Sequence, residues 1–481
     1  MMCCLNKTQL VVFLMIVTVL SLTGCQSLSR FGLKTSDSGN PLVAIHSSIE
    51  AYRFSLDYEQ NLIGTLATVN SQAEDTLPDL ARHFGLGHQE IVNANPTLDL
   101  WQPPAQTRVV LPLMFTLPDA PHKGIVLNLA SMRLFYYPED RHQQVITYPV
   151  GIGREGWETP LGRMRIISKT QNPVWVVPPS IQQEHAQKGE TLPAIVASGA
   201  NNPLGEYALK LSRSGYLIHG TNKPYGIGLR VSHGCLNLYP EHIRELYQVV
   251  NVGTAVRIVE QPYLLGWQQE MLFLEAHKPL QNKDFKSPLI AKIRQLAQTR
   301  KLTIDWTRVE QVLAQANGIP TPIELGSVDA QYLMTHALSV AHPTSLNYLP
   351  SIPSLTDNDW SIEVASWDNQ STAQRLTTVL NHQGPIIPAR IIPRSEGVFV
   401  VVAGPFNTQE QTELVQKRLV NDFNLHTTIQ PPLALRSQYL SSSINNQLPR
   451  LNAPAHFNEL PSLKSNPSND KSSWLNWLPF N

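Results

Sequence analysis

The feature that most constrains this chain is a segment in which a predicted strand, a glycine-rich loop and a cysteine follow one another. The apolar triplet at residues 216–218 predicts a strand that ends at His219. The loop after it leads to the run Ser-His-Gly-Cys at residues 232–235, and a helix is predicted to begin near Pro240. His219 and Cys235 are therefore expected at the ends of regular elements that bracket one loop.

The N-terminus has the anatomy of an export signal. An apolar run at residues 10–20 precedes Leu-Thr-Gly-Cys at residues 22–25, which is similar to the lipobox of bacterial lipoproteins. That resemblance implies that residues 1–24 are removed and that Cys25 carries a membrane-buried lipid. Gln26, where Asp would favour the inner membrane, implies an outer-membrane anchor with the body in the periplasm. The alternative, an uncleaved membrane helix, would need a longer apolar run of approximately 20 residues.

Cys235 is an unusual thiol for an exported chain. Of the four cysteines, two leave with the signal and Cys25 is expected to carry lipid, so Cys235 has no disulfide partner. A thiol is nucleophilic as the thiolate, which needs an imidazole or a positive environment to form near neutral pH. His219 and His233 are the available imidazoles, and Gly234 leaves room for main-chain N–H groups to approach a reacting carbonyl.

These residues resemble the L,D-transpeptidase (YkuD-type) family, whose mark is a histidine followed within about twenty residues by Ser/Thr-His-Gly-Cys. The likeness begins at residues 124–128 and ends near Val259. It implies a mainly β catalytic domain over residues 122–260, with the cysteine at a cleft.

The same resemblance implies a reaction. Cys235 would attack the carbonyl between the diamino acid and the D-alanine of a tetrapeptide stem of the cell wall, and D-alanine would leave. His219 would be the general base, oriented by a backbone carbonyl near Gly220. His233 and the main-chain N–H groups of Gly234 and Cys235 would support the oxyanion. An acceptor amine would then resolve the thioester, with no cofactor and no metal.

Four polar side chains near the motif are candidates for holding stem carboxylates and amides: Asn222, Tyr225, Arg230 and Asn237. Arg230 is favoured because a guanidinium binds a carboxylate in a bidentate manner. Many members of the family carry arginine where this chain has Asn237, and others carry asparagine. The acceptor, either a second diaminopimelate or the terminal lysine of a protein, therefore stays open.

Other interpretations use the same residues. Zinc bound by His219, His233 and Cys235 would need ligand pairs with about two to five residues between them, and the His-x-Cys pair has a single residue between its members, so no metal is expected. An L,D-carboxypeptidase would keep every catalytic residue and use water as the acceptor. A non-catalytic peptidoglycan-binding lipoprotein, or an inert buried thiol, would not require the paired motif.

Residues 58–115 resemble a LysM module, which implies binding of glycan rich in N-acetylglucosamine. Thr76 can cap a helix with one apolar face, and Asn95 with Pro96 can close a second helix. The alternative is a small docking domain without sugar affinity, because Glu74 stands where such modules usually have glycine.

The remaining segments complete a multidomain α+β chain. Residues 25–57 and 320–357 are expected to be linkers, and residues 261–319 carry two apolar stripes that predict a helical extension. Residues 358–431 alternate strand and helix patterns and resemble a SPOR domain, a βαββαβ fold that binds glycan strands stripped of peptides. A plain α+β interaction domain would show the same pattern. Residues 432–481 form a low-complexity tail.

Bulk charge points to no particular class of partner. Lys plus Arg and Asp plus Glu each total 37, so the net charge of zero provides no general attraction to nucleic acid. A length of 481 residues, at about 150 per domain, suggests roughly three folded units. The expected partners are peptidoglycan stems, glycan strands and, through the lipid, a membrane.

Overall fold

The computed structural model describes residues 45–436, except for 47–48, 50, 57–59, 141–142, 188–190, 383–385, 395–396 and 426. The chain divides into two units, residues 1–44 and 45–481. The signal at residues 1–24, the lipidation site Cys25 and the tail beyond residue 436 lie outside the described residues. Within the described part, no helix has both the length and the apolar character needed to cross a membrane.

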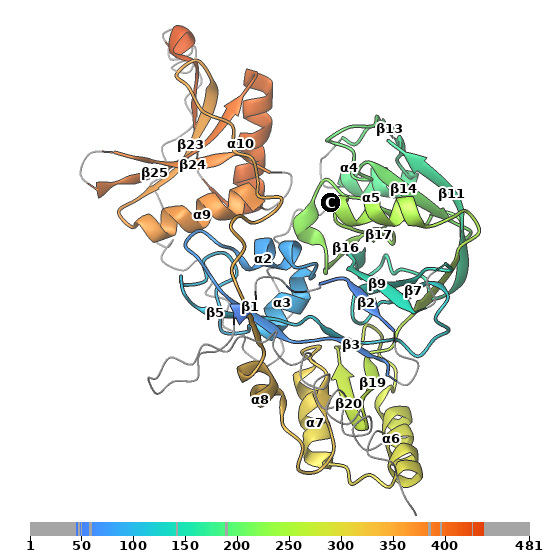
Figure 1. Ribbon diagram of the computed structural model, residues 1–481. Helices are drawn as coiled ribbons and strands as arrows, with labels where there is room; N and C mark the ends of the chain where they lie inside the picture. Colours follow the sequence, from blue (N-terminus) through green and yellow to red (C-terminus); the bar gives the residue numbers. More distant parts are fainter. Residues whose placement is uncertain are drawn as a thin grey trace, which may run out of the picture. The chain divides into compact units, whose positions relative to one another are not determined.

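A nine-stranded sheet forms the centre of the catalytic domain, in the order β17-β15-β14-β11-β18-β7-β8-β9-β2. Helix α5 (Pro240–Val249) lies against β14 (Figure 1) and buries Ile243 and Leu246 in the core. The strands are β2 (Arg53–Ser55), β7 (Gly124–Asn128), β8 (Arg133–Tyr137), β9 (Gln144–Pro149), β11 (Gly162–Gln171), β14 (Tyr207–Leu211), β15 (Leu217–His219), β17 (Leu236–Asn237) and β18 (Ala255–Val259). The predicted β-rich catalytic domain is confirmed.

The central strands separate two hydrophobic cores. Every residue of β7 and β8 is buried, so neither strand shows the alternation of a half-exposed strand. Val126 and Phe135 belong to one core, whereas Leu127 and Leu134 belong to the other. The sheet is therefore covered on both faces.

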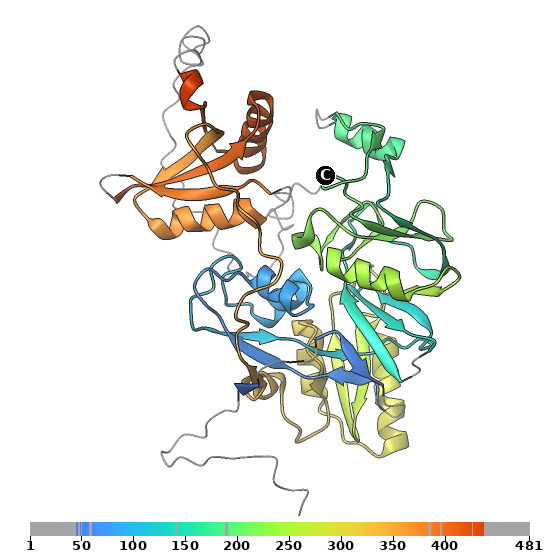
Figure 2. The same cartoon turned by 45° about the horizontal axis from the view of Figure 1, so that its top comes forward.

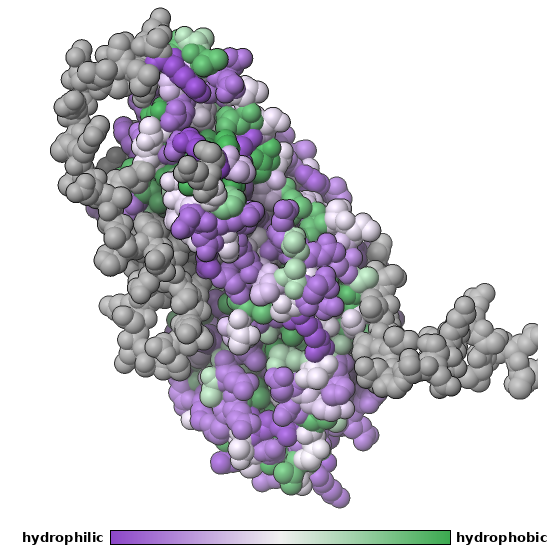
Figure 3. All heavy atoms as spheres, turned by 90° about the vertical axis from the view of Figure 1, so that its left-hand side faces the viewer, coloured by the Kyte–Doolittle hydropathy of each residue, from purple (hydrophilic) through white to green (hydrophobic). Residues whose placement is uncertain are grey.

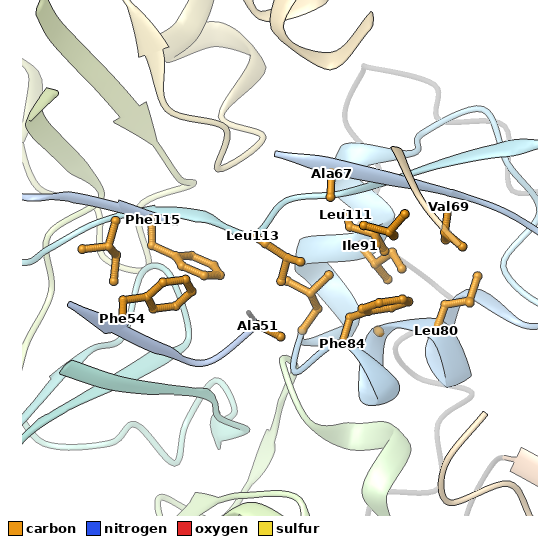
Figure 4. Packing of buried hydrophobic residues seen from close by; sticks show 14 of the residues in the cluster. Ala51, Phe54, Ala67, Val69, Leu80, Phe84, Ile91, Leu111, Leu113 and Phe115 are labelled. Carbon is orange, nitrogen blue, oxygen red and sulfur yellow. The ribbon is translucent and has the colours of Figure 1, made fainter. Parts of the chain in front are cut away.

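The first of these cores contains an N-terminal hairpin of helices. Strand β4 (Ala67–Asn70), helix α2 (Leu77–His83), helix α3 (His88–Ala94) and strand β5 (Arg108–Leu111) follow in order, and β4 pairs antiparallel with β5. Leu80, Phe84 and Ile91 lie in one cluster with Leu111 (Figure 4). As predicted, the Thr76 side chain caps α2 by accepting a hydrogen bond from Asp79 N, and α3 ends at Asn95.

The expected linkers contribute strands to the folded body, which differs from the prediction. Strand β1 (Ile45–His46) pairs with β22 (Leu338–Val340), β22 pairs with β4, and β2 joins the large sheet beside β9. Strands of two or three residues are too short to show a hydrophobic period, so the sequence pattern missed them. The second expected linker, residues 320–357, also contains β21 (Thr321–Pro322) and α8 (Ala330–Thr335).

The region predicted as a helical extension is mixed in structure. Helices α6 (Lys286–Arg300) and α7 (Trp306–Gln315) occur where the apolar stripes placed them. They pack in one core with the hairpin of β19 (Tyr263–Gln268) and β20 (Met271–Ala276), drawn in yellow in Figures 1 and 2. The strands complete the core that two helices alone would leave open.

The C-terminal domain has its own sheet and core. Its elements are β23 (Trp360–Trp367), α9 (Gln370–His382), β24 (Ala389–Pro393), β25 (Phe399–Phe406), α10 (Gln409–Phe423) and β26 (Thr428–Gln430), followed by the turn η3 (Leu433–Leu435). The sheet order is β24-β25-β23-β26, with all pairs antiparallel. This is a βαββαβ succession around a core separate from those described above.

Several short elements complete the described structure. They are β3 (Leu62–Gly64), β6 (Met114–Thr116), β10 (Ile152–Gly153), β12 (Trp175–Val176), α4 (Pro179–Gln187), β13 (Ile195–Val196), η1 (Pro224–Gly226) and β16 (Arg230–Ser232). On the face in Figure 3 the described residues are mostly hydrophilic, with apolar residues in small groups.

Acid should destabilise this fold through three buried histidines. Burial lowers the pKa of His88, His219 and His242 to about 4 each, below the ordinary value of 6.5. Between pH 6.5 and 4 these histidines are protonated in the unfolded chain but stay neutral in the folded chain. The free energy of unfolding therefore falls as pH drops through this range. Each histidine contributes about 1.4 kcal/mol per pH unit.

Urea unfolding at pH 7, 6 and 5 measures this slope. His88→Gln should make the dependence on pH shallower, whereas His336→Gln, at an exposed position, should leave it unchanged. Equal slopes in wild type and His88→Gln would contradict the assignment.

Candidate active site

The strands β15 and β17 place the candidate catalytic residues on one face. They pair in parallel, with Ile218 opposite Leu236 and His219 opposite Asn237. Ile218 and Leu236 are buried in the core. Since successive side chains on a strand alternate, His219 and Asn237 point to the other face, together with Cys235 one step before β17. The sequence motif is thus gathered by a single strand pair.

The Cys235 thiol is half-buried and protonated at rest. Its Sγ donates a hydrogen bond to Gly215 O at 3.7 Å. Burial raises the pKa of Cys235 to about 11, against the opposing hydrogen bond from the Leu217 backbone. The resting thiol is therefore neutral at physiological pH.

His219 is buried and also neutral. Its Nδ1 lies 2.6 Å from Gly220 O, the neighbourhood in which the sequence placed the orienting carbonyl. Because a carbonyl only accepts, Nδ1 carries the proton, and in the neutral ring Nε2 holds the lone pair. Burial lowers the pKa of His219 to about 4, although hydrogen bonds with the Gly220 and Leu204 backbone oppose this shift.

His233 lies in a polar cluster with two residues that the sequence did not single out. Its Nε2 is 2.9 Å from Arg154 Nη2 and 3.0 Å from Glu184 Oε2 of α4. The Trp157 ring packs edge-on, with ring centroids 4.8 Å apart. Burial and Arg154 lower the pKa of His233, and Glu184 opposes them. No local pattern in the sequence marks Arg154 or Glu184, because 79 and 49 residues separate them from His233.

Gly234 has a conformation that favours glycine. Its φ is +101°, and a Cβ there would lie 3.0 Å from the Tyr216 ring. Its N–H donates to Ser232 Oγ at 3.2 Å, and its carbonyl accepts from Thr159 Oγ1 at 2.9 Å. Ser232 Oγ in turn donates to Cys235 O at 2.5 Å. These bonds fix the backbone that carries the thiol.

The four substrate-binding candidates divide into two groups. Asn222 Oδ1, Arg230 Nε and Asn237 Oδ1 are buried and have no hydrogen-bond partner among the described residues. Tyr225 is different because its hydroxyl donates to Asp79 Oδ1 at 2.9 Å. Within the described part, no group of three or more His, Cys, Asp or Glu side chains could hold a metal ion.

Comparison with known proteins gives the family. The family model for the L,D-transpeptidase catalytic domain (YkuD) matches residues 122–258. The probable L,D-transpeptidase ErfK/SrfK of Escherichia coli (strain K12) is 37% identical over 297 residues, covering 60% of this chain and 95% of that protein. The chain belongs to the L,D-transpeptidase family. Its enzymatic class and the family predicted from the paired motif are confirmed.

Other proteins are similar to parts of this chain. The probable L,D-transpeptidase YbiS of the same strain is 35% identical over 269 residues, covering 54% of this chain and 86% of that protein. A solved catalytic domain from E. faecium L,D-transpeptidase is 21% identical, with a TM-score of 0.23, covering 29% of this chain and 99% of that chain. The SPOR family model matches residues 356–424, which confirms the predicted SPOR domain.

The helical hairpin of this transpeptidase holds the loop between the two candidate catalytic residues, His219 and Cys235. His88 N and Gln89 N, in the first turn of α3, donate to Ile227 O at 2.9 Å and Gly228 O at 3.3 Å. A Cβ at Gly228 would lie 2.5 Å from His88 N, so the contact requires glycine. The hairpin therefore contributes directly to the active-site loop.

Two ion pairs fix the hairpin on the catalytic domain. Arg82 Nε and Nη2 donate to the two carboxylate oxygens of Glu241, both at 2.9 Å, and this links α2 to α5. Arg133 Nε and Nη2 bind both oxygens of Glu90 at 2.7 Å, and this links β8 to α3. Bidentate pairs of this kind are strong and directional.

Breaking the first pair should be costly. Glu241→Gln leaves the buried Arg82 guanidinium without its carboxylate, and we expect the free energy of unfolding to fall by about 3 kcal/mol. Urea unfolding measures the loss. The control is Glu310→Gln, which breaks the exposed Lys286 pair and should cost about 0–1 kcal/mol. Equal losses in the two variants would contradict the role given to Arg82.

The reactivity of the resting thiol should follow its raised pKa. Without substrate, the rate of Cys235 alkylation by iodoacetamide should rise about tenfold per pH unit from pH 7 to 10, because only the thiolate reacts. Mass spectrometry of the peptide containing Cys235 separates it from the other cysteines, and Cys235→Ser serves as the blank. A plateau at or below pH 8.5 would show that the free enzyme already holds a thiolate.

Proposed function

We propose that this L,D-transpeptidase acts through Cys235 on tetrapeptide stems of peptidoglycan, releasing D-alanine. The product is a cross-link between two diaminopimelate residues or the attachment of a protein to the wall. The observation that carries the proposal is the register of β15 and β17, which places the His219 and Cys235 side chains on the same face of the strand pair. His219 and the thiol supply the base and the nucleophile that acyl transfer requires.

The resting protonation states lead to a specific sequence of proton transfers. As Sγ bonds to the diaminopimelate carbonyl carbon, the thiol proton passes to His219 Nε2. Because thiol and imidazole are both neutral beforehand, this transfer accompanies attack rather than preceding it. The imidazolium is a strong acid, since the pKa of His219 is lowered to about 4. It therefore protonates the D-alanine amine readily as the C–N bond breaks.

The second half reverses these transfers. The acceptor amine attacks the thioester and gives a proton to His219, and Sγ recovers its proton as it leaves. The N–H groups around Gly234 and Cys235, with His233, are proposed to support the oxyanion. In the described structure Gly234 N–H donates to Ser232 Oγ, so that bond must be exchanged or shared during the reaction. Asn222, Arg230 and Asn237 present buried polar atoms free to meet the stem.

The flanking parts extend the proposal. The β4-α2-α3-β5 module is proposed to be LysM-like and to bind glycan rich in N-acetylglucosamine, which its order of elements supports. The SPOR domain is proposed to bind glycan strands stripped of peptides. Cys25 is proposed to carry the lipid that anchors the enzyme in the periplasm, at the outer membrane.

The decisive experiment follows products from disaccharide tetrapeptides by mass spectrometry, with and without an added amine acceptor. Wild type should release D-alanine and form the amine adduct or the dimer. Cys235→Ala should abolish release, and His219→Gln should lower kcat about 10²- to 10⁴-fold. His336→Gln is the control for an exposed histidine.

Two outcomes would change the proposal. Tripeptide alone, even with acceptor present, would identify an L,D-carboxypeptidase that uses the same thiol. Unchanged products from Cys235→Ala would overturn the catalytic role of Cys235 and leave a peptidoglycan-binding lipoprotein as the alternative.

A further inference from the structure

A cavity of about 310 Å³ opens beside the loop that joins the catalytic residues. Its walls come from α3, the turn between β7 and β8, the segment after β20, and the loop residues Gly228 and Arg230. Neither Cys235 nor His219 lines it. The cavity is therefore a separate space that shares one strand, β16, with the active site.

The carboxylates of this cavity already have partners. Glu90 accepts from Arg133 Nε and Nη2 and, at 2.6 Å, from Gly87 N. Glu275 Oε2 accepts from Thr116 N at 2.6 Å, and its Oε1 lies 2.6 Å from His277 Nε2. The oxygens of both carboxylates are thus already paired with protein groups, which disfavours binding of a cation from solution.

Arg133 is bound to Glu90, but the other two cations of the cavity, Arg230 and Lys278, are available to a ligand. Arg230 Nε is buried without a hydrogen-bond partner, and Lys278 is exposed and forms no ion pair among the described residues. Arg133, Arg230 and Lys278 stand against two carboxylates in the lining, which leaves one net positive charge, 3 − 2 = +1. Available donors with a positive charge are complementary to an anion that accepts hydrogen bonds.

The floor of the cavity is rigid. Arg133 is almost fully buried, and its guanidinium lies 4.0 Å from the Phe115 ring centroid. Gly228 is held against the first turn of α3, and a Cβ at Gly318 would lie 2.9 Å from the His277 ring. A preformed site loses less entropy when a ligand binds.

Arg230 lies between the cavity and the segment that carries Cys235. It precedes Ser232, whose Oγ donates to Cys235 O. The pKa of the exposed Glu158 carboxyl group is lowered, mainly by the hydrogen bond from the Gly156 backbone and in part by the nearby charge of Arg230. The Glu158 carbonyl oxygen would be 3.7 Å from a Cβ at Gly234. A ligand held by Arg230 therefore lies near the segment that carries the nucleophile.

We propose that this cavity is a subsite for a free carboxylate of a peptidoglycan stem peptide, bound by Arg230 and Lys278 while the stem reaches Cys235. The inference rests on the proposed function and adds a determinant outside the catalytic domain, because Lys278 follows β20. A neutral glycan would gain nothing from the two cations. The carboxylate belongs either to the acyl donor or to the acceptor stem.

Direct binding tests the subsite independently of turnover. In the Cys235→Ala background, calorimetry compares stems with free carboxylates and stems in which these are amidated. The free-acid stem should bind about tenfold more tightly, as expected for one charge-assisted hydrogen bond. Adding Lys278→Gln or Arg230→Gln should remove this preference, and adding Lys123→Gln, which removes an exposed lysine outside the cavity, should not.

The two sources of the carboxylate are separated by stem length. A tetrapeptide can act as donor, whereas a tripeptide without D-alanine acts only as acceptor. Loss of preference confined to one of them assigns the subsite to that stem. In turnover, Lys278→Gln should raise KM for the assigned stem about tenfold and leave kcat within about twofold.

Equal binding of free-acid and amidated stems, or a preference that survives both substitutions, would overturn the subsite. Failure of the proposed function would look different: wild type would release no D-alanine from any stem, whatever the carboxylate preference measured in the Cys235→Ala protein.

Discussion

The active site depends on the contact between the first turn of α3 and the loop that follows His219. The first N–H groups of a helix have no partner within it, and here two of them bind the carbonyls of Ile227 and Gly228. The absence of a side chain at Gly228 allows this approach. The loop that carries Arg230 toward Cys235 is therefore held by main-chain bonds from the N-terminal hairpin.

This contact explains why the N-terminal hairpin is not an independent domain. The strands β7 and β8 direct alternate side chains into two cores, and one of these cores is completed by α2 and α3. Removing the hairpin would expose one face of the catalytic sheet and leave Arg133 and Glu241 without their partners. The hairpin thus serves as structural support for the catalytic sheet.

Local patterns predicted what depends on local sequence. The strand that ends at His219, the cap at Thr76 and the helix from Pro240 each follow from neighbouring residues, and each is present. The family also followed from a short motif. The pairing of β22 with β4, by contrast, joins segments about 270 residues apart and involves only two register pairs. Strands this short show no hydrophobic period from which the pairing could be predicted. The partners of His233 were missed for the same reason.

The neutral resting states of Cys235 and His219 protect the thiol from oxidation while leaving it able to react with substrate. The reactive form of cysteine toward oxidants and disulfides is the thiolate. Burial holds the Cys235 thiol protonated, with a pKa of about 11, so an unpaired thiol can persist in an oxidising compartment. Burial likewise keeps His219 neutral, so that in the proposed mechanism its ring can accept the thiol proton when a carbonyl carbon comes within bonding distance. In the proposed mechanism, activation is thereby tied to the arrival of substrate, and the proposed subsite beside the loop would position the stem for it.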